Sequence, residues 1–304
     1  MKISTSFLFD RATSRMSTIQ NKLATTQAQL SVSKQVLSPS DAPDQAAAIQ
    51  RLKGEVDRQN SHAALLKTAL NRYQAEETAS SSANDIVIRL KELSIQAAND
   101  TLGPGDRKAI AVEMKALRDQ LLSLGNSRDD SGNYLFSGTR VKTPAFMELP
   151  TGQVQYNGDQ TQTRIPAGVE RTVQYTRAGT DVFQRVVRDN GQSVGFFDAL
   201  DQTIAAVENS QTGQIQRGIA DLDQMHGGLT LALAQTGSDQ KVVQSQLDVL
   251  DETTLRLKST LSEIEDLDYA EAVTRMNKEV MALEAAMGSF AKISGLTLFD
   301  YIRG

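Results

Sequence analysis

An apolar residue at every seventh position near the start of the chain constrains the fold most strongly. The repeat consists of Phe9, Met16, Leu23, Leu30 and Leu37. A companion row begins at Ala12 and Ile19 and becomes polar at Thr26. Such spacing forms the narrow seam of a coiled coil, whereas a helix in a globular core has a broader apolar face. We therefore predict one helix over residues 5–37 that requires a partner helix.

A similar seam occupies the last part of the chain. Mostly apolar residues follow alternating steps of four and three from Val243 to Ile264, and the pattern then slips by one residue. The rhythm resumes through Tyr269, Val273, Met276, Val280, Leu283, Met287 and Phe290. One unbroken helix over residues 243–294 would be roughly 78 Å long at a rise of about 1.5 Å per residue. The pattern predicts an elongated, mainly α-helical molecule.

Proline and glycine divide the rest of the chain. Residues 44–103 and 167–304 contain no proline. Pro39 disfavours helical dihedral angles at the residue before it, and Asp41 is a favourable N-cap for a following helix. The apolar spacing then predicts helices at 43–99, around 110–124, at 196–210 and from about residue 214.

The segment 133–188 differs from the helical segments in composition and predicted secondary structure. Eight of the 15 aromatic residues lie between positions 134 and 197. Asn157-Gly158 is typical of a tight hairpin turn. We expect a small β-rich insertion between two helical arms, with strand candidates at 134–136, 153–156, 161–165 and 169–175.

Composition narrows the possible chemistry. The chain has no cysteine, which excludes disulfides and thiolate metal sites, and only two histidines, His62 and His226. The net charge of -5 argues against nucleic acid as the main partner and against a polybasic membrane anchor. The sequence has no stretch of 18 apolar residues that would predict a membrane-spanning helix, and residues 1–30 do not have the apolar core of a signal peptide.

The two ends differ in charge. Residues 1–40 carry five basic side chains and one acid, whereas residues 248–271 carry eight acids and two basic side chains. The two segments could attract each other, either within one chain or between neighbouring copies. The alternative is that both are ordinary solvated helix faces.

One motif resembles a catalytic one. Residues 191–195 match G-x-S-x-G with Ser193 at its centre, and His226 is the only histidine that follows. A hydrolase with this motif needs a large, mostly parallel sheet, which this helical chain does not offer. We therefore expect a loop and a helix start here, no catalytic residue and no enzyme. His62 stands alone, and the acidic run 263–268 is expected to be helical, so neither predicts a metal site.

Neither seam can bury its apolar stripe well in a pair of lone helices. We hypothesise that both chain ends are mobile in the monomer and become ordered when many copies pack together. The alternative is an ordinary coiled coil within one chain.

Two stretches resemble the bacterial flagellin family. Residues 30–49 end one helix with a turn rich in Ser and Asp and re-enter helix through alanines. Residues 262–272 form an acidic stretch that contains Tyr269-Ala270. Both occur at the ends and in the order that the family has, and the resemblance covers essentially the whole chain, with residues 133–188 as a variable outer insertion.

Within the family, the chain is most similar to the members that join the hook to the filament. Filament flagellins usually have Asp-Asp-Ala-Ala-Gly after the first turn, whereas residues 41–46 lack that glycine. A filament flagellin remains the alternative. The stretches that carry the junction similarity are residues 1–6, 117–126, 132–138 and 143–146.

The resemblance implies a flagellin-like bundle of long helices, with paired N- and C-terminal helices and a small β-rich outer insertion. The inner coiled-coil core would comprise residues 1–43 and 265–304. A helical-bundle domain would comprise 44–132 and 190–264, and the outer domain 133–189.

The resemblance also implies a structural role in the flagellum. Copies of the chain would form a ring between hook and filament, with the first hook-associated protein on the hook side and flagellin on the filament side. A cytoplasmic chaperone would hold the C-terminal helix before export through the flagellar type III apparatus, without a cleaved signal peptide. The protein would then be extracellular, and no cofactor is implied. The assembly interface that we predict consists of Phe9, Met16, Leu23, Leu30, Val273, Met276, Val280, Leu283, Met287 and Phe290.

Overall fold

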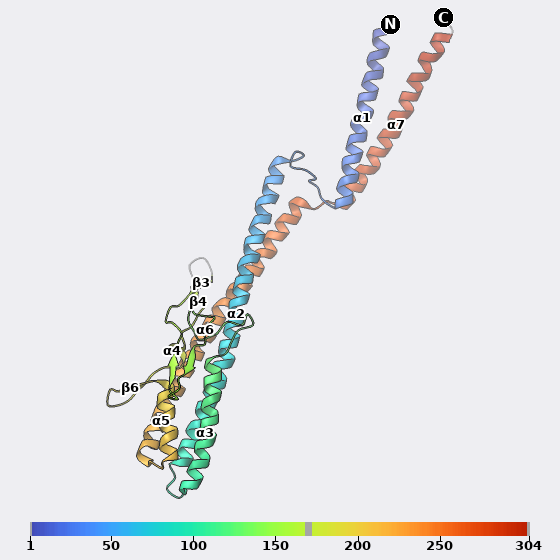
Figure 1. Cartoon of the computed structure of the whole chain (residues 1–304). Coiled ribbons are helices and arrows are strands. Elements are labelled where there is room, and N and C mark those ends of the chain that lie inside the picture. Colours follow the sequence, from blue (N-terminus) through green and yellow to red (C-terminus); the bar gives the residue numbers. More distant parts are fainter. Residues whose placement is uncertain (1, 168–171, 303–304) are drawn as a thin grey trace. The chain divides into compact units, whose positions relative to one another are not determined.

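The computed structural model describes residues 2–167 and 172–302. Seven helices account for most of them (Figure 1). Their bounds are α1 Lys2–Val32, α2 Pro43–Ala97, α3 Pro104–Gly125, α4 Gly179–Val182, α5 Phe196–Glu208, α6 Thr212–Glu265 and α7 Tyr269–Ile302. The predicted mainly α fold and its long helices are confirmed. Within the described residues, no helix is both long enough and apolar enough to cross a membrane.

The first helix ends earlier than its repeat predicts. Ser33 adopts a left-handed conformation with φ 60°, and α1 stops at Val32. The backbone that follows pairs with the far end of the chain, because Gln35 N–H donates to the Glu265 carbonyl at 2.8 Å. Leu37, the fifth residue of the repeat, therefore lies outside the helix, and our prediction of a helix to residue 37 is wrong.

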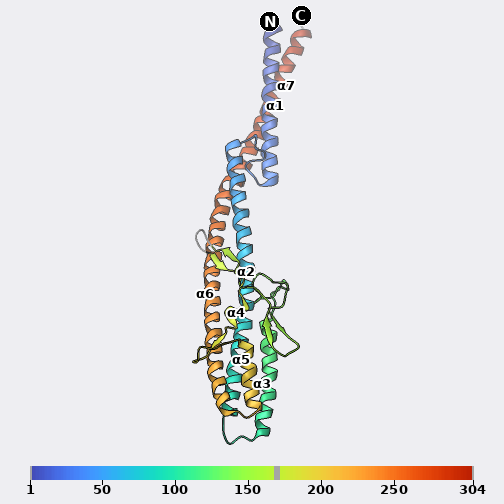
Figure 2. The same cartoon turned by 60° about the vertical axis from the view of Figure 1, so that its left-hand side comes forward.

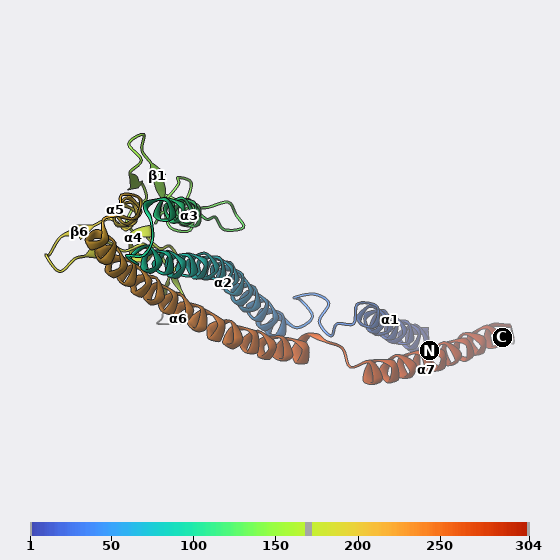
Figure 3. The ribbon, with the colours of Figure 1, turned by 90° about the horizontal axis from the view of Figure 1, so that it is seen from below.

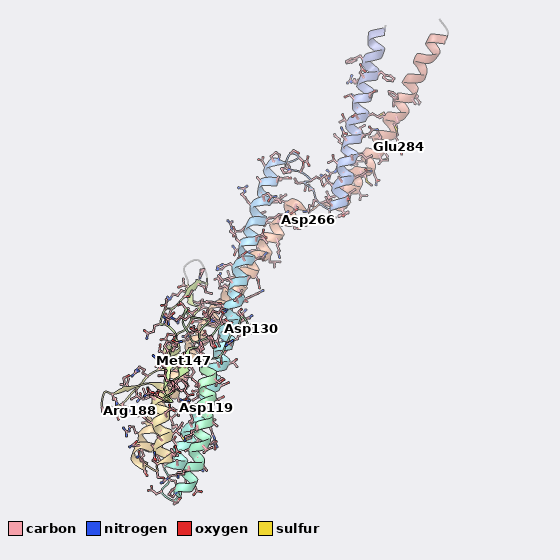
Figure 4. The ribbon with its side chains drawn as sticks, in the orientation of Figure 1. Asp119, Asp130, Met147, Arg188, Asp266 and Glu284 are labelled. Carbon is pink, nitrogen blue, oxygen red and sulfur yellow. The ribbon has the colours of Figure 1, made fainter. Side chains whose placement is uncertain are left out.

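The slip in the C-terminal seam marks a break between two helices. The α6 helix ends at Glu265 and α7 begins at Tyr269, so the acidic run 263–268 is only partly helical, contrary to our expectation. Asp268 accepts a hydrogen bond from the Glu271 N–H at 3.0 Å, as an N-cap does. Asp266 lies in this connection (Figure 4).

The chain divides into two compact units. One comprises Met1–Asn60 with Glu252–Gly304, and the other comprises Ser61–Asp251. In the first unit, α1 and α7 lie side by side in both views, as expected for paired terminal helices (Figures 1 and 2). In the second unit, α3 and α5 pack together beside α2 and α6 (Figure 3). The three-domain division that the family resemblance implies stays a prediction.

Leucines from the helices and a group of phenylalanines form the core of the second unit. Leu90 and Leu93 of α2, Leu121 of α3 and Leu200 of α5 are almost completely buried. Four aromatic rings join the insertion to α5, and the centroids of Phe183 and Phe197 each lie within 6 Å of those of the other three, in mostly edge-to-face pairs: Phe146, Phe183, Phe196 and Phe197.

The described residues of the insertion and of the segment just after it form three separate antiparallel strand pairs. They are β1 Phe146–Glu148 with β2 Val154–Tyr156, β3 Arg164–Pro166 with β4 Thr172–Gln174, and β5 Val186–Val187 with β6 Ser193–Val194. The predicted β-rich insertion is thus present as small hairpins. Residues 134–136 are not a strand and form only an isolated bridge at Tyr134. Residues 169–171 of a predicted strand lie outside the described residues.

Our hairpin turn at Asn157-Gly158 is also wrong. The Asn157 N–H donates to the Ala145 carbonyl at 2.8 Å, and β2 pairs with β1 rather than with β3. Gly152, with φ +83°, makes the turn of this hairpin instead, and its N–H donates to the Leu149 carbonyl at 2.8 Å. A turn that combines Asn with Gly is only a local preference, and strand pairing elsewhere overrides it.

Buried charges attach the insertion to α2 and α6. Arg72 of α2 donates to the Leu135 carbonyl at 2.7 Å and to Asp129 at 3.1 Å. Glu76, one turn further along α2, lies between Arg72 and Arg177 at 3.4 and 3.5 Å. Burial raises the pKa of the Glu76 carboxyl to about 7, although the charges of Arg72 and Arg177 oppose this shift. The network fixes residues from three distant parts of the sequence in one place.

Candidate assembly interface

An aromatic contact joins α1 and α7 at the end of the pair that lies toward the two chain termini. The rings of Phe9 and Phe290 have centroids 4.6 Å apart and are tilted by 52°. Both residues belong to the seams that the heptad spacing predicts. The contact lies toward the N-terminal end of α1 and the C-terminal end of α7, so the two helices run antiparallel (Figure 1).

The other end of the pair is held by Tyr269, the first residue of α7. Its hydroxyl donates to the Leu30 carbonyl at 3.1 Å and lies 2.6 Å from the Ser33 hydroxyl. Positions 9 and 30 are 21 residues apart, and so are positions 269 and 290. Both ends of the pair therefore have the same register across three heptads.

This register places the other seam residues opposite one another. Met16 falls opposite Leu283, and Leu23 falls opposite Met276. In the companion row, the same register pairs Val280 with Ile19, Met287 with Ala12 and Val273 with Thr26. Thr26 is 3% exposed and also lines a hollow with Arg275 and Glu279 of α7. Extended along both helices, this register assigns all ten residues predicted for the interface to rows on or beside the facing sides of α1 and α7. Their role in contacts between copies stays a prediction.

The seam is only half-buried within one chain. Phe9, Val273 and Met287 remain 42%, 41% and 45% exposed. Met16, Leu23, Leu30 and Leu283 are intermediate, and none of the ten residues is fully buried. Two helices cover only one side of each apolar stripe, so the pair has apolar surface that further helices could bury.

A polar joint connects this pair to the remainder of the first unit. Glu265, at the end of α6, accepts from Lys34 at 2.5 Å and from Lys53 of α2 at 2.8 Å. The hydrogen bonds from Lys34 and then from Lys53 hold the pKa of the Glu265 carboxyl below its usual value. Lys34 and Glu265 come from the basic and acidic ends of the sequence, so this pair is one case of attraction within the chain.

Sequence reasoning missed an apolar hollow beside this joint. It has a volume of about 460 Å³ and is lined by Val36, Leu37, Pro39, Pro43 and Ile49, with Lys34 and Glu265 at its edge. Leu37, which we assigned to the helical seam, contributes to this hollow instead. No local pattern predicts the hollow, since it exists only because the connection after α1 folds back onto α2.

The structure separates the residues of the hydrolase-like motif. Ser193 lies in β6, and its hydroxyl accepts from Arg185 Nε at 2.9 Å. The ring of His226 instead makes a hydrogen bond with Asn84 at 2.7 Å. Ser193 is part of a two-stranded antiparallel hairpin rather than of a sharp turn between a parallel strand and a helix, so the setting of a nucleophile elbow is not met.

Neither histidine has the surroundings of a metal ligand. His62 Nε2 lies 3.1 Å from the Pro166 carbonyl. Among the residues that the structure describes, no group of three or more His, Asp or Glu side chains could hold a metal ion.

Comparison with known proteins agrees with this architecture. The family model for the bacterial flagellin N-terminal helical region matches residues 3–141, and the model for the C-terminal helical region matches residues 219–302. Flagellar hook-associated protein 3 of Salmonella typhimurium is 26% identical in an alignment 321 residues long, which covers 100% of both chains. Polar flagellin A of Vibrio parahaemolyticus is 22% identical over 289 residues, covering 72% of this chain and 77% of the flagellin.

A solved structure has the same fold. The flagellar hook associated protein-3 of Legionella pneumophila has a TM-score of 0.64 and 18% identity, and the match covers 71% of this chain and 98% of that one. The two family models together account for well over half of the sequence and include both terminal helices. The chain therefore belongs to the bacterial flagellin family.

Proposed function

We propose that this protein is a structural subunit of the bacterial flagellum that assembles with copies of itself at the junction between hook and filament. The observation that carries the proposal is the half-buried antiparallel seam between α1 and α7. A subunit that works alone gains nothing from an apolar stripe on two paired helices, whereas a subunit in a ring buries it against its neighbours.

The junction position rests on the extent of the similarity. Hook-associated protein 3 of Salmonella typhimurium aligns with this chain over the full length of both, whereas the flagellin alignment covers 72% of this chain. A filament flagellin is the alternative function. Polymerisation separates the two, because flagellin should grow long filaments from seeds and a junction protein should stop after a ring.

The proposed neighbours follow from the position in the flagellum. The subunit would contact the first hook-associated protein on one side and flagellin on the other. Before assembly, a cytoplasmic chaperone would cover the apolar face of α7, and export would proceed through the flagellar type III apparatus without a cleaved signal peptide. The role is mechanical, so the proposal includes no catalytic step and no cofactor.

The three-domain division becomes part of this proposal. Residues 1–43 with 265–304 would form the inner core of the ring. Residues 44–132 with 190–264 would form the next layer, and residues 133–189 would face outward. Both chain ends would be mobile before assembly and would become ordered in the ring, since partial burial gives the isolated pair little stability. Strong protection of the α1 amides from hydrogen exchange in the monomer would contradict this order of events.

A deletion strain tests the function directly. Cells without the gene should keep their hooks, lose their filaments and release flagellin monomers into the medium. Expression of the intact chain should restore filaments, and the protein should be found in isolated flagella. If the deletion strain made hooks but no released flagellin and the protein polymerised into long filaments, the flagellin alternative would replace the junction role.

A further inference from the structure

A stripe of exposed residues that includes three basic side chains runs along α1 beside the seam with α7. Its residues Thr18, Lys22 and Thr25 also line a hollow of about 510 Å³ with Arg275 and Glu279 of α7. We name this stripe the basic stripe, and it consists of Phe7, Arg11, Arg15, Thr18, Lys22 and Thr25. These residues follow one another in steps of three and four, so they share one helix face. All six are exposed, and Phe7 is 64% exposed. This face lies roughly a third of a turn from the seam residues, because each helical residue rotates by about 100°.

A second exposed stripe runs along the last part of α6, within the same unit. We name it the acidic stripe, and it consists of Glu252, Leu255, Arg256, Ser259 and Glu263. It lies on the side of α6 opposite the partly buried Leu257, Leu261 and Ile264. Leu255 is 69% exposed, which leaves an apolar side chain among charged ones.

Most charges on these stripes have no partner within one chain. In the part of the chain that the structure describes, Arg11, Arg15 and Lys22 make no ion pair, and neither does Glu263. Glu252 reaches only Arg256 on its own helix, at 3.9 Å. Among the described residues, the ion pair that joins the basic and acidic ends within the chain is Lys34 with Glu265, and it involves neither stripe.

We propose that the basic stripe docks antiparallel onto the acidic stripe of a second copy of this chain. Arg11 and Lys22 are 11 residues apart, and Glu252 and Glu263 are also 11 residues apart. Both intervals span roughly 16 Å along a helix. Two helices packed side by side can therefore form both ion pairs at once.

The antiparallel direction follows from the remaining charge on each stripe. When Arg11 faces Glu263 and Lys22 faces Glu252, Arg256 falls opposite Thr18 and Arg15 falls opposite Ser259. The parallel alignment that forms two ion pairs would place Arg15 against Arg256, and like charges in contact disfavour association. Only the antiparallel alignment pairs opposite charges without this repulsion.

We assign a second copy of this chain as the partner of the basic stripe because the complementary surface, the acidic stripe, is on the same chain. The two stripes are different surfaces, so their contact is head-to-tail and repeats from one subunit to the next, as a ring requires. The inference therefore rests on the proposed self-assembly and adds which helix faces meet. Exposed ion pairs stabilise a contact only slightly, so their main effect here is on register and on the rate of association.

Crosslinking of assembled protein tests the contact. The chain contains no cysteine, so two introduced cysteines react alone. Thr18→Cys with Ser259→Cys places the thiols about 4.5 Å apart along the helix axis in the proposed register, whereas the matched control, Thr25→Cys with Ser259→Cys, separates them by about 15 Å. On flagella isolated from a complemented deletion strain, a short bismaleimide should convert the first variant into a ladder of covalent oligomers and the control into far fewer.

The outcomes separate this inference from the proposed function. If both variants enter flagella and crosslink equally, or not at all, the stripe contact is wrong and the junction role stands. If even the unaltered chain is absent from flagella, the proposed function fails. Charge exchange supplies a second measurement: Arg11→Glu with Lys22→Glu should lower incorporation by about tenfold. Adding Glu252→Lys and Glu263→Lys to that variant should restore incorporation, and failure of this rescue in folded protein would overturn the proposal.

Discussion

Tyr269 and Leu30 are 239 positions apart in the sequence, yet the tyrosine hydroxyl donates to the leucine carbonyl at 3.1 Å. This bond sets the register of α1 against α7, and the Phe9–Phe290 contact keeps the same register three heptads away. The pair is therefore a defined antiparallel structure, and its half-exposed residues form a single surface that mutations can address.

A charge in the middle of the seam should prevent assembly without unfolding the second unit. Leu23→Asp places a carboxylate opposite Met276, where it loses apolar contact and some hydration, at a cost of about 2 kcal/mol. We expect loss of incorporation into flagella and an unchanged thermal transition of residues 61–251. Ser17→Asp, at an exposed position of α1 away from the seam, should incorporate normally. Normal incorporation of Leu23→Asp would show that the seam is not an assembly surface.

Glu76 should make the stability of the second unit depend on pH near neutrality. Its pKa is raised by burial to about 7, above the value of an unfolded chain. Because the folded state binds this proton more tightly, the carboxyl stabilises the fold fully at pH values below its pKa in the unfolded chain. This stabilisation is lost as pH rises through its pKa in the folded state. The free energy of unfolding should therefore fall between about pH 4.5 and pH 7, by at most about 3 kcal/mol from this group. Denaturant titrations at several pH values should show that the free energy of unfolding depends less on pH in Glu76→Gln than in the unaltered chain. Identical pH dependence in the two proteins would exclude Glu76 as the cause.

The buried pair of Arg188 and Asp221 should be costly to break from one side. The Arg188 Nη2 atom lies 2.6 Å from an Asp221 carboxylate oxygen, and both side chains are at least nine-tenths buried (Figure 4 labels Arg188). Arg188→Met leaves the carboxylate buried without its partner and should destabilise the second unit by about 3–5 kcal/mol. The double variant Arg188→Met with Asp221→Leu should recover most of that loss. Urea unfolding of the unaltered chain, Arg188→Met, Asp221→Leu and the double variant measures the coupling, which would be absent if the two single effects were additive.

Two glycines of α6 should respond oppositely to alanine. A Cβ atom at Gly218 would lie 2.9 Å from the Cβ of Thr203 on α5, with other atoms of that side chain closer still. Gly218→Ala should therefore separate α5 from α6 and cost about 1–3 kcal/mol. Gly227 has nothing within 4 Å of the same position, so Gly227→Ala should stabilise the helix by up to about 1 kcal/mol. Melting temperatures that move in the same direction would contradict the packing described for Gly218.

The heptad spacing contains most of the information about the terminal pair. Facing positions on two coiled-coil helices must share one period, so the repeat alone assigns residues such as Met16 and Leu283 to the seam. The break after Glu265 is also visible as a slip in that period. Local periodicity, however, does not state where a helix ends. Leu37 continues the repeat, but the chain leaves the helix at Ser33 because its backbone pairs with distant residues.

The features that sequence reasoning missed depend on contacts between distant segments. Arg72, Glu76 and Arg177 meet in the folded chain although about a hundred residues separate the last from the others. Asn157-Gly158 has the composition of a hairpin turn, yet the pairing of β1 with β2 assigns it another place. Hydrogen bonds and ion pairs of this kind leave no periodic trace in the sequence, whereas apolar seams do.

The joint at Tyr269 and Glu265 also has a consequence for the order of folding. Before the joint can form, the chain must close a loop of more than two hundred residues, which carries a large entropic cost in an unfolded chain. Folding of residues 61–251 shortens that loop. The α1–α7 pair should therefore become ordered last, during assembly, starting from the joint and ending at Phe9 and Phe290. A subunit would then present the apolar seam of α1 and α7 to its neighbours only after residues 61–251 have folded, which limits premature aggregation of incompletely folded copies.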